Sequence, residues 1–187
     1  MRKNNLSASS RQGGFTQHHF RSGRLGSQIK KHKSGAGFTL IELLVVIAII
    51  GLLSTLAVVA LNSARLKARD AKRIADVKQI QTALELYFND SDSYPYDGGG
   101  GGYVLGVDVT CLGSGGFLAA GCSSPIYMGL VPSNPTPNGT AYTYNALSAG
   151  SGCTGADCSS YTIEFQLEGR TGGLSSGLHT ASQDGIQ

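Results

Sequence analysis

The chain has 187 residues, a formal net charge of +3, an apolar fraction of 41%, four cysteines and no tryptophan. This length allows one small folded domain with extensions and excludes an assembly of several large domains. The charge is divided unevenly, because residues 1–36 hold eight Lys or Arg and no acid, whereas the remainder has a net charge of −5 from seven basic and twelve acidic residues.

Residues 1–36 are rich in Ser, Gly, Gln, His and basic side chains, a composition that cannot bury enough apolar surface to fold. A disordered, basic arm that serves as a removable leader is the preferred interpretation. The alternatives are a nucleic-acid or acidic-lipid patch and a metal site. The residues available to them are Arg21, Arg24, Lys30, Lys31, His32 and Lys33 for the patch, and His18, His19 and His32 for the metal. Nucleic acid is not expected as a partner, and the histidine spacing specifies no metal site.

Residues Phe38 to Leu61 form an apolar run of 24 residues whose only charge is Glu42. A helix of this length rises about 36 Å, enough to cross the hydrocarbon of a bilayer. The basic arm predicts that the amino end stays in the cytoplasm and that the carboxyl end is exported. An ordinary secretory signal is not expected, because its apolar core is shorter and would leave Glu42 without a purpose. A carboxylate near the membrane centre costs on the order of 2.5–3.5 kcal/mol, so Glu42 needs a compensating partner.

The sequence around this carboxylate contains Gly37, Phe38, Thr39 and Glu42, followed by the apolar residues Leu43 to Gly51. It resembles the class III signal of the type IV pilin family, which includes the pseudopilins of type II secretion. The resemblance implies that a prepilin peptidase cuts after Gly37 and methylates the new amino terminus at Phe38. It also implies an assembly role for Thr39 and Glu42, in which the carboxylate pairs with the amino terminus of a neighbouring subunit.

From Asn62 the sequence becomes polar while a helical period continues, and no Gly or Pro interrupts Leu52 to Asn89. We therefore predict one helix from about Phe38 to Asn89, apolar to Leu61 and amphipathic beyond. Its apolar face would carry Leu66, Ile74, Val77, Ile80, Ala83, Leu84, Tyr87 and Phe88. The opposite face is expected to be solvated, with Arg65, Lys67, Arg69, Asp70, Lys72, Arg73, Asp76, Lys78 and Glu85. The basic residues between Arg65 and Arg73 could alternatively meet lipid head groups, DNA or an acidic neighbour.

The remaining sequence predicts a small β domain. Asn89 to Pro95 ends the helix, Gly98 to Gly102 form a flexible connection, and residues 103–140 are expected to be irregular. Alternating patterns predict strands at Thr140–Asn145 and Ser160–Glu168. Gly169 to Gly173 allow a hairpin into a third strand at Leu174–Ala181, and the three are expected to form an antiparallel sheet. The predicted fold class is α+β and pilin-like, with a long helix packed on a small antiparallel sheet. The segments are a cleaved leader (1–37), the helix (38–90, of which 38–61 is transmembrane and fibre core) and a disulfide-containing β domain (91–187).

Four cysteines, Cys111, Cys122, Cys153 and Cys158, lie on the predicted exported side, where disulfides persist. Of the three possible connectivities, we prefer the local pairs 111–122 and 153–158. No catalytic set is evident, since His179 is isolated and Glu164 and Glu168 are expected to be solvated on one strand. No cofactor is expected. Calcium, which related pseudopilins hold in a carboxy-terminal loop, would find only Asp184 and the more distant Asp157.

The resemblance implies a structural filament subunit and not an enzyme. The preferred function is a type IV pilus-like subunit, because tryptophan and a clear acidic calcium loop are absent. The first alternative is the major-type pseudopilin of a type II secretion system, and the second is a single-pass anchor that displays a binding domain. The implied partners are other copies of the chain, the prepilin peptidase, an assembly platform and the membrane. The expected location is the inner or cytoplasmic membrane, followed by a cell-surface or periplasmic filament.

Overall fold

A computed structural model of the chain describes residues 37–99, 101–155 and 157–187. Residues 1–36 of the predicted leader, with the basic patch and three histidines, lie outside these residues, as do Gly100 and Ala156. Contacts divide the chain after Leu44 into a first unit that ends there and a second unit, Val45–Gln187. The two units are described separately below.

One long helix, α1, extends from Leu40 to Ser91 and comprises 52 residues. It begins two residues later than the apolar run because Thr39 occupies the N-cap position, where its carbonyl accepts the N–H of Leu43 at 3.3 Å. It ends at Ser91, two residues beyond the predicted Asn89, and a left-handed residue, Asp92, follows with φ of 52°. The N–H of Asp92 donates to the carbonyl of Phe88 at 2.8 Å and closes the last turn.

The carboxyl half of α1 buries one face. Val77, Ile80, Ala83 and Leu84 are buried in the core, as the helical period predicts. Four further residues of the predicted face are half-buried: Leu66, Ile74, Tyr87 and Phe88. This face belongs to a single apolar cluster that includes the inward side of the sheet, so helix and sheet share one core.

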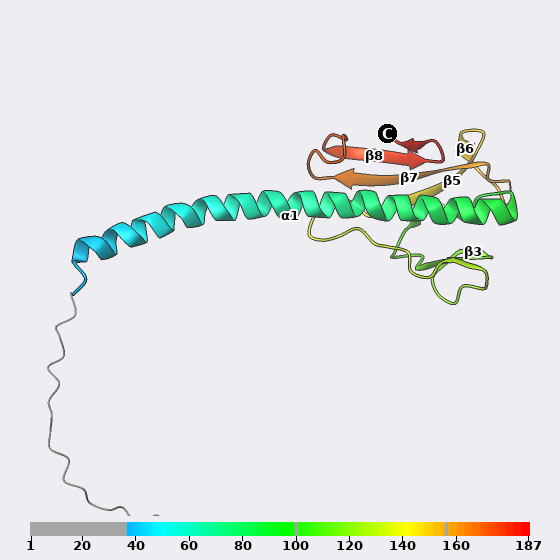
Figure 1. Ribbon diagram of the computed structural model, residues 1–187. Helices are drawn as coiled ribbons and strands as arrows, with labels where there is room; N and C mark the ends of the chain where they lie inside the picture. Colours follow the sequence, from blue (N-terminus) through cyan, green and yellow to red (C-terminus); the bar gives the residue numbers. More distant parts are fainter. Residues whose placement is uncertain (1–36, 100, 156) are drawn as a thin grey trace, which may run out of the picture. The chain divides into compact units, whose positions relative to one another are not determined.

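The main sheet has the strand order β1-β5-β7-β8-β9, with β6 paired to β5, and every pairing is antiparallel (Figure 1). Its strands are β1 (Tyr103–Val104), β5 (Thr143–Ser148), β6 (Ser151–Gly152), β7 (Ser160–Leu167), β8 (Gly177–Ser182) and β9 (Gly185–Ile186). The three predicted strands correspond to β5, β7 and β8, with ends displaced by a few residues. In the register, Tyr144 lies opposite Ile163, and Phe165 lies opposite His179.

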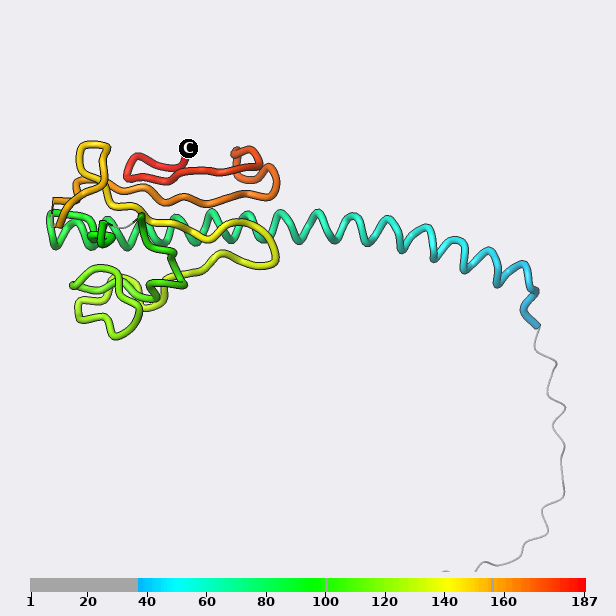
Figure 2. The backbone as a smooth tube through the Cα atoms, turned by 180° about the vertical axis from the view of Figure 1, so that it is seen from behind, coloured from blue at the N-terminus to red at the C-terminus, as the bar shows by residue number. Residues whose placement is uncertain are grey.

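Strand β7 alternates as its sequence predicts. Tyr161, Ile163, Phe165 and Leu167 are buried, while Glu164 is exposed. The buried row faces α1, which runs along the sheet in both views (Figures 1 and 2). The predicted α+β class, a long helix packed on a small antiparallel sheet, is therefore confirmed.

The prediction that residues 103–140 are irregular is wrong. A second sheet of order β3-β2-β4 lies there, formed by β2 (Cys111–Gly113), β3 (Gly116–Leu118) and β4 (Ile126–Met128). Each strand has three residues, too few for an alternating pattern to be recognised. The sheet contributes Leu112 and Phe117 to the core, and the ring of Phe117 lies 5.0 Å from that of Tyr144.

Candidate processing and assembly site

The first turn of α1 forms a reciprocal capping box between Thr39 and Glu42. The backbone N–H and the hydroxyl of Thr39 both donate to Oε2 of Glu42, each at 2.9 Å. In return, Oγ1 of Thr39 accepts the backbone N–H of Glu42 at 3.2 Å. Such a box satisfies N–H groups that the helix itself cannot pair, and it places the carboxylate at the positive end of the helix dipole. The Thr-x-x-Glu spacing carries this signal, which the sequence analysis overlooked.

Gly37 and Phe38 lie immediately before the cap. A Cβ built at Gly37 would meet no atom within 4 Å, and the side chain of Phe38 is 86% exposed. Both residues precede the first helical residue, so the peptide bond between them is in non-helical backbone. The structure thus brings Thr39 and Glu42 into direct contact and leaves the Gly37–Phe38 bond open on the described chain.

Every residue from Phe38 to Leu61 is exposed in the described chain. Within α1, the apolar part has no buried residue, and the helix is long and apolar enough to cross a membrane. Within the helical part of this run, the hydroxyl of Thr55 donates a hydrogen bond to the backbone carbonyl of Leu52 at 2.8 Å. Residues 38–61 are therefore an apolar, almost entirely helical surface that the described fold leaves uncovered.

A buried ion cluster fastens the sheet to α1 beyond this surface. Nη1 of Arg73 lies 2.6 Å from Oδ1 of Asp70 and 2.7 Å from Oε1 of Glu168. Arg69 binds Glu168 through two parallel contacts of 2.7 and 2.6 Å. Asp70 also accepts the backbone N–H groups of Glu168 and Gly169, at 2.9 and 2.8 Å. The end of β7 is thereby held to one turn of the helix.

The same cluster holds the proline-rich loop that precedes β5. Nε of Arg73 donates to Oδ1 of Asn134 at 2.7 Å, and Nη2 donates to the carbonyls of Pro135 and Asn138. The side chain of Asn138 donates to Glu168 at 3.0 Å. Hydrogen bonding from Arg69, supported by Asn138 and Arg73, holds the pKa of Glu168 well below its usual value and outweighs the opposing effect of burial.

The prediction that the polar face of the helix is solvated is therefore wrong for three residues. Asp70 and Arg73 are fully buried, and Asp76 is 7% exposed. Asp76 forms an ion pair with Lys72 at 2.9 Å and accepts a hydrogen bond from the hydroxyl of Tyr142 at 3.2 Å. Burial is the main cause that raises the pKa of Tyr142. Glu168 was also expected to be solvated, but it forms ion pairs with Arg69 and Arg73. The sequence offered only the local spacings of Asp70 to Arg73 and of Lys72 to Asp76 as signals, because the other partners lie more than sixty residues away.

The structure pairs Cys111 with Cys122 and Cys153 with Cys158. The first bond joins β2 to the segment that follows β3. The second closes a short loop before β7, where the carbonyl of Cys158 accepts the N–H of Tyr94 at 2.8 Å. The second bond therefore braces a loop that is hydrogen-bonded to the segment just beyond the end of α1.

Among the residues that the structure describes, no three His, Cys, Asp or Glu side chains gather as metal ligands. Asp184 lies in the turn between β8 and β9, and Asp157 lies in the Cys153–Cys158 loop. The ring nitrogens of His179 contact the carbonyls of Gln187 and Ser175, at 3.0 and 2.8 Å. These contacts give the isolated histidine a structural position at the end of the sheet.

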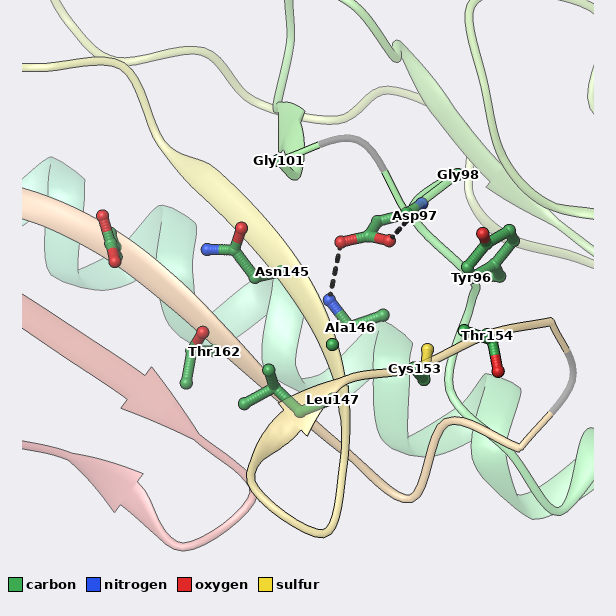
Figure 3. A pocket seen from close by; sticks show the side chains of 13 residues that line it. Tyr96, Asp97, Gly98, Gly101, Asn145, Ala146, Leu147, Cys153, Thr154 and Thr162 are labelled. Carbon is green, nitrogen blue, oxygen red and sulfur yellow. Dashed lines mark hydrogen bonds between the residues drawn. The ribbon is translucent and has the colours of Figure 1, made fainter.

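A polar cleft of about 600 Å³ lies where the glycine connection meets strand β5 (Figure 3). At its edge, Asp97 accepts the N–H of Gly99 at 2.9 Å and that of Ala146 at 3.2 Å. The cleft is also lined by Tyr96, Thr162 and Glu164. The buried carboxylate of Asp97 accepts hydrogen bonds from backbone N–H groups of two segments, so its role in this cleft is structural.

Comparison with known proteins finds a matching family model and several similar relatives. A family model described as "Prokaryotic N-terminal methylation motif" matches residues 32–58. The chain is 34% identical over 121 residues to type II secretion system core protein G of Escherichia coli K12, which covers 61% of this chain and 80% of that protein. The proteins of the same name from Aeromonas hydrophila and Vibrio cholerae are 40% identical over 60 residues and 36% identical over 67 residues.

The match to the Aeromonas protein covers 32% of this chain and 42% of that protein, and the match to the Vibrio protein covers 36% and 46%. In these two relatives the chain therefore spans less than half of their length. No solved structure matches the chain. The named relatives favour the secretion alternative over the pilus function that the sequence analysis preferred. The chain belongs to the family of type II secretion system core protein G.

Proposed function

We propose that the chain is a structural subunit of a type II secretion pseudopilus, made as a precursor and polymerised through its apolar helix. The observation that carries this proposal is the uncovered apolar surface of residues 38–61, which has one carboxylate, Glu42, in the capping box near its amino end. Burial of apolar surface stabilises by roughly 25 cal/mol per Å², so a run of this size favours a bilayer or a bundle of like helices over water. The membrane would hold the subunit before assembly, and other copies would cover the same surface afterwards.

Processing would take place at the Gly37–Phe38 bond. Cleavage frees a cationic amine at Phe38, and methylation keeps its charge. The capping box is compatible with this step, because the N–H of Thr39 that binds Glu42 remains an amide after the cut. The prepilin peptidase and an inner-membrane assembly platform are the partners that this proposal requires.

Assembly would use the second oxygen of the Glu42 carboxylate. Thr39 binds Oε2 twice, whereas Oε1 accepts no hydrogen bond from the described residues. The cap therefore fixes the direction of the carboxylate and leaves Oε1 for the amino terminus of a neighbouring copy. A buried ion pair of this kind contributes registration more than stability, which suits a polymer whose helices must stop at one level.

The processing step is tested by expressing the full chain with a prepilin peptidase and analysing its amino terminus by mass spectrometry. The wild type should begin at methylated Phe38, and Gly37→Val should keep the leader. Gly51→Val is the matched control, since a Cβ at Gly51 also meets no atom within 4 Å, and it should be cut normally. Filaments whose subunits keep the leader would contradict the proposal.

The secretion role is tested in cells that lack this chain. Release of the secreted proteins should stop while surface motility and adhesion continue. Cells that keep the chain should yield filaments of it in the periplasmic fraction. Loss of motility with normal secretion would support the pilus alternative. A processed chain that never enters sheared or overproduced filaments would support the single-pass anchor.

A further inference from the structure

Three exposed basic side chains gather at the end of the folded domain that lies nearest the apolar run. Arg65 and Lys67 are on α1, and Arg170 follows β7 in the loop to β8. None of the three forms an ion pair with the residues that the structure describes. Arg170 is more than a hundred residues from the other two, so only the fold brings it to this end.

Close packing of Gly169 fixes the position of Arg170. A Cβ at Gly169 would lie 2.6 Å from Cδ2 of Leu66, so the loop backbone lies directly against the helix between Arg65 and Lys67. The N–H of Gly169 donates to Asp70, which holds the loop in place. In both views the loop between β7 and β8 is at the end of the sheet where α1 extends beyond it (Figures 1 and 2).

The neighbouring charges are already balanced inside the domain. Arg69 and Arg73 are matched by Asp70 and Glu168, and Lys72 is matched by Asp76. The exposed charges without an ion-pair partner among the described residues at this level are therefore the three positive charges of Arg65, Lys67 and Arg170. The next acid along the helix beyond Asp76 is Glu85, eighteen residues after Lys67 and about 27 Å farther along the axis.

We propose that Arg65, Lys67 and Arg170 form a basic collar that binds anionic phospholipid head groups on the exported face of the membrane. The inference rests on the proposed function, in which residues 38–61 span the bilayer. Arg65 and Lys67 follow Leu61 by four and six residues, which places them about 6–9 Å beyond the apolar run. The head-group layer on each side of the hydrocarbon is about 5–8 Å thick, so the collar lies at its level.

The arrangement of the collar favours a lipid surface over a single protein neighbour. Residues two apart on a helix point in nearly opposite directions, so Arg65 and Lys67 flank Leu66 on both sides. A neighbouring copy would meet one side, whereas a plane of head groups meets both. Long basic side chains also extend readily from an apolar segment toward phosphate. The collar would set the depth of the subunit and release when the helix is extracted.

The experiment uses the full processed chain, one copy per lipid nanodisc, with spin-labelled phosphatidylglycerol or phosphatidylcholine as the probe. The wild type should bind the anionic probe more strongly, by up to about fivefold for each collar residue at low salt, and less so at high salt. Arg65→Gln combined with Lys67→Gln and Arg170→Gln should bring the two probes to parity. Lys78→Gln is the control, since Lys78 is an exposed base eleven residues farther along the same helix, and it should keep the wild-type preference.

Four results would overturn the collar. An unchanged preference in the triple variant, or an equal loss in Lys78→Gln, would show that these residues do not form the site. A preference that appears only with two copies per disc would assign the residues to a neighbouring subunit. Loss of the preference on adding soluble glycerophosphate at matched ionic strength would show binding of free phosphate. Release of the wild-type chain from the bilayer by alkaline carbonate would instead contradict the proposed function.

Discussion

Arg73 and Asp70 are one helical turn apart on α1 and fully buried, with Nη1 of the arginine 2.6 Å from Oδ1 of the aspartate. The pair lies on what the sequence alone marks as a solvated face. It is buried because Glu168 at the end of β7 and the carbonyls of the proline-rich loop complete its hydrogen bonds. The helix, the sheet and this loop therefore meet at a polar core.

Replacing Arg73 should test this polar core directly. Arg73→Ala leaves Asp70 buried without its cation, and such a loss costs about 3–5 kcal/mol in the free energy of unfolding. Chemical denaturation of the full chain in detergent, followed by loss of β structure, would measure it. The exposed Lys78→Ala should change stability by less than about 0.5 kcal/mol. An effect of that small size for Arg73→Ala would show that the cluster does not hold the fold.

The low pKa of Glu168 predicts a stability that depends on acidity. The carboxyl titrates below its usual value of 4.5 in the folded chain, because it accepts hydrogen bonds from Arg69 first, then from Asn138 and Arg73. The unfolded chain therefore binds the proton more readily than the folded one, and the contribution of Glu168 is present in full above pH 4.5. It is lost as the pH falls from there toward the folded pKa.

Glu168→Gln should flatten this dependence. The variant would be less stable than the wild type at neutral pH, and the difference between the two should shrink as the pH falls below about 4.5. Denaturation midpoints measured at several acidities would test it. A constant difference across the range would mean that another acid controls the acid transition.

The two disulfides should stabilise a domain whose core is small. Loop-closure entropy gives roughly 2–3 kcal/mol for each short loop. Cys111→Ser combined with Cys122→Ser should lower the free energy of unfolding by about that amount and should loosen the second sheet first. Thiol labelling of the exported wild-type domain should find no reactive cysteine, and labelling of all four would refute the pairing.

Glu42→Gln should separate processing from assembly. The amide can still cap Thr39 and is less costly in the membrane than a carboxylate, so insertion and cleavage should continue. The attraction to a neighbouring amino terminus is lost, and removing one partner of a buried pair costs about 3–5 kcal/mol. We expect processed monomer in the membrane and almost no filament. Thr39→Ser, which keeps the cap, is the control and should assemble, whereas a normal filament yield from Glu42→Gln would refute the role of its charge.

Local patterns in the sequence determine much of this protein. Four patterns can each be recognised from residues close together in the sequence: the apolar run, the helical period to Phe88, the alternation of Tyr161 to Leu167, and the motif from Gly37 to Glu42. Secondary structure depends on such short spacings, so the long helix, the main strands and the family resemblance could be predicted from them. The choice between a pilus and a secretion function could not be predicted from these patterns. The named relatives favour secretion.

Tertiary structure alone decided which polar groups are buried and which charges remain free. Arg73 looks like any exposed helical arginine until Glu168, Asn134 and Asn138 surround it. Arg170 joins Arg65 only because Gly169 packs on Leu66. The burial of a charge depends on partners that lie far away in the sequence, since a carboxylate or guanidinium leaves water only where other groups replace its hydrogen bonds. No short pattern encodes those partners, and so the polar core and the basic collar come from the fold.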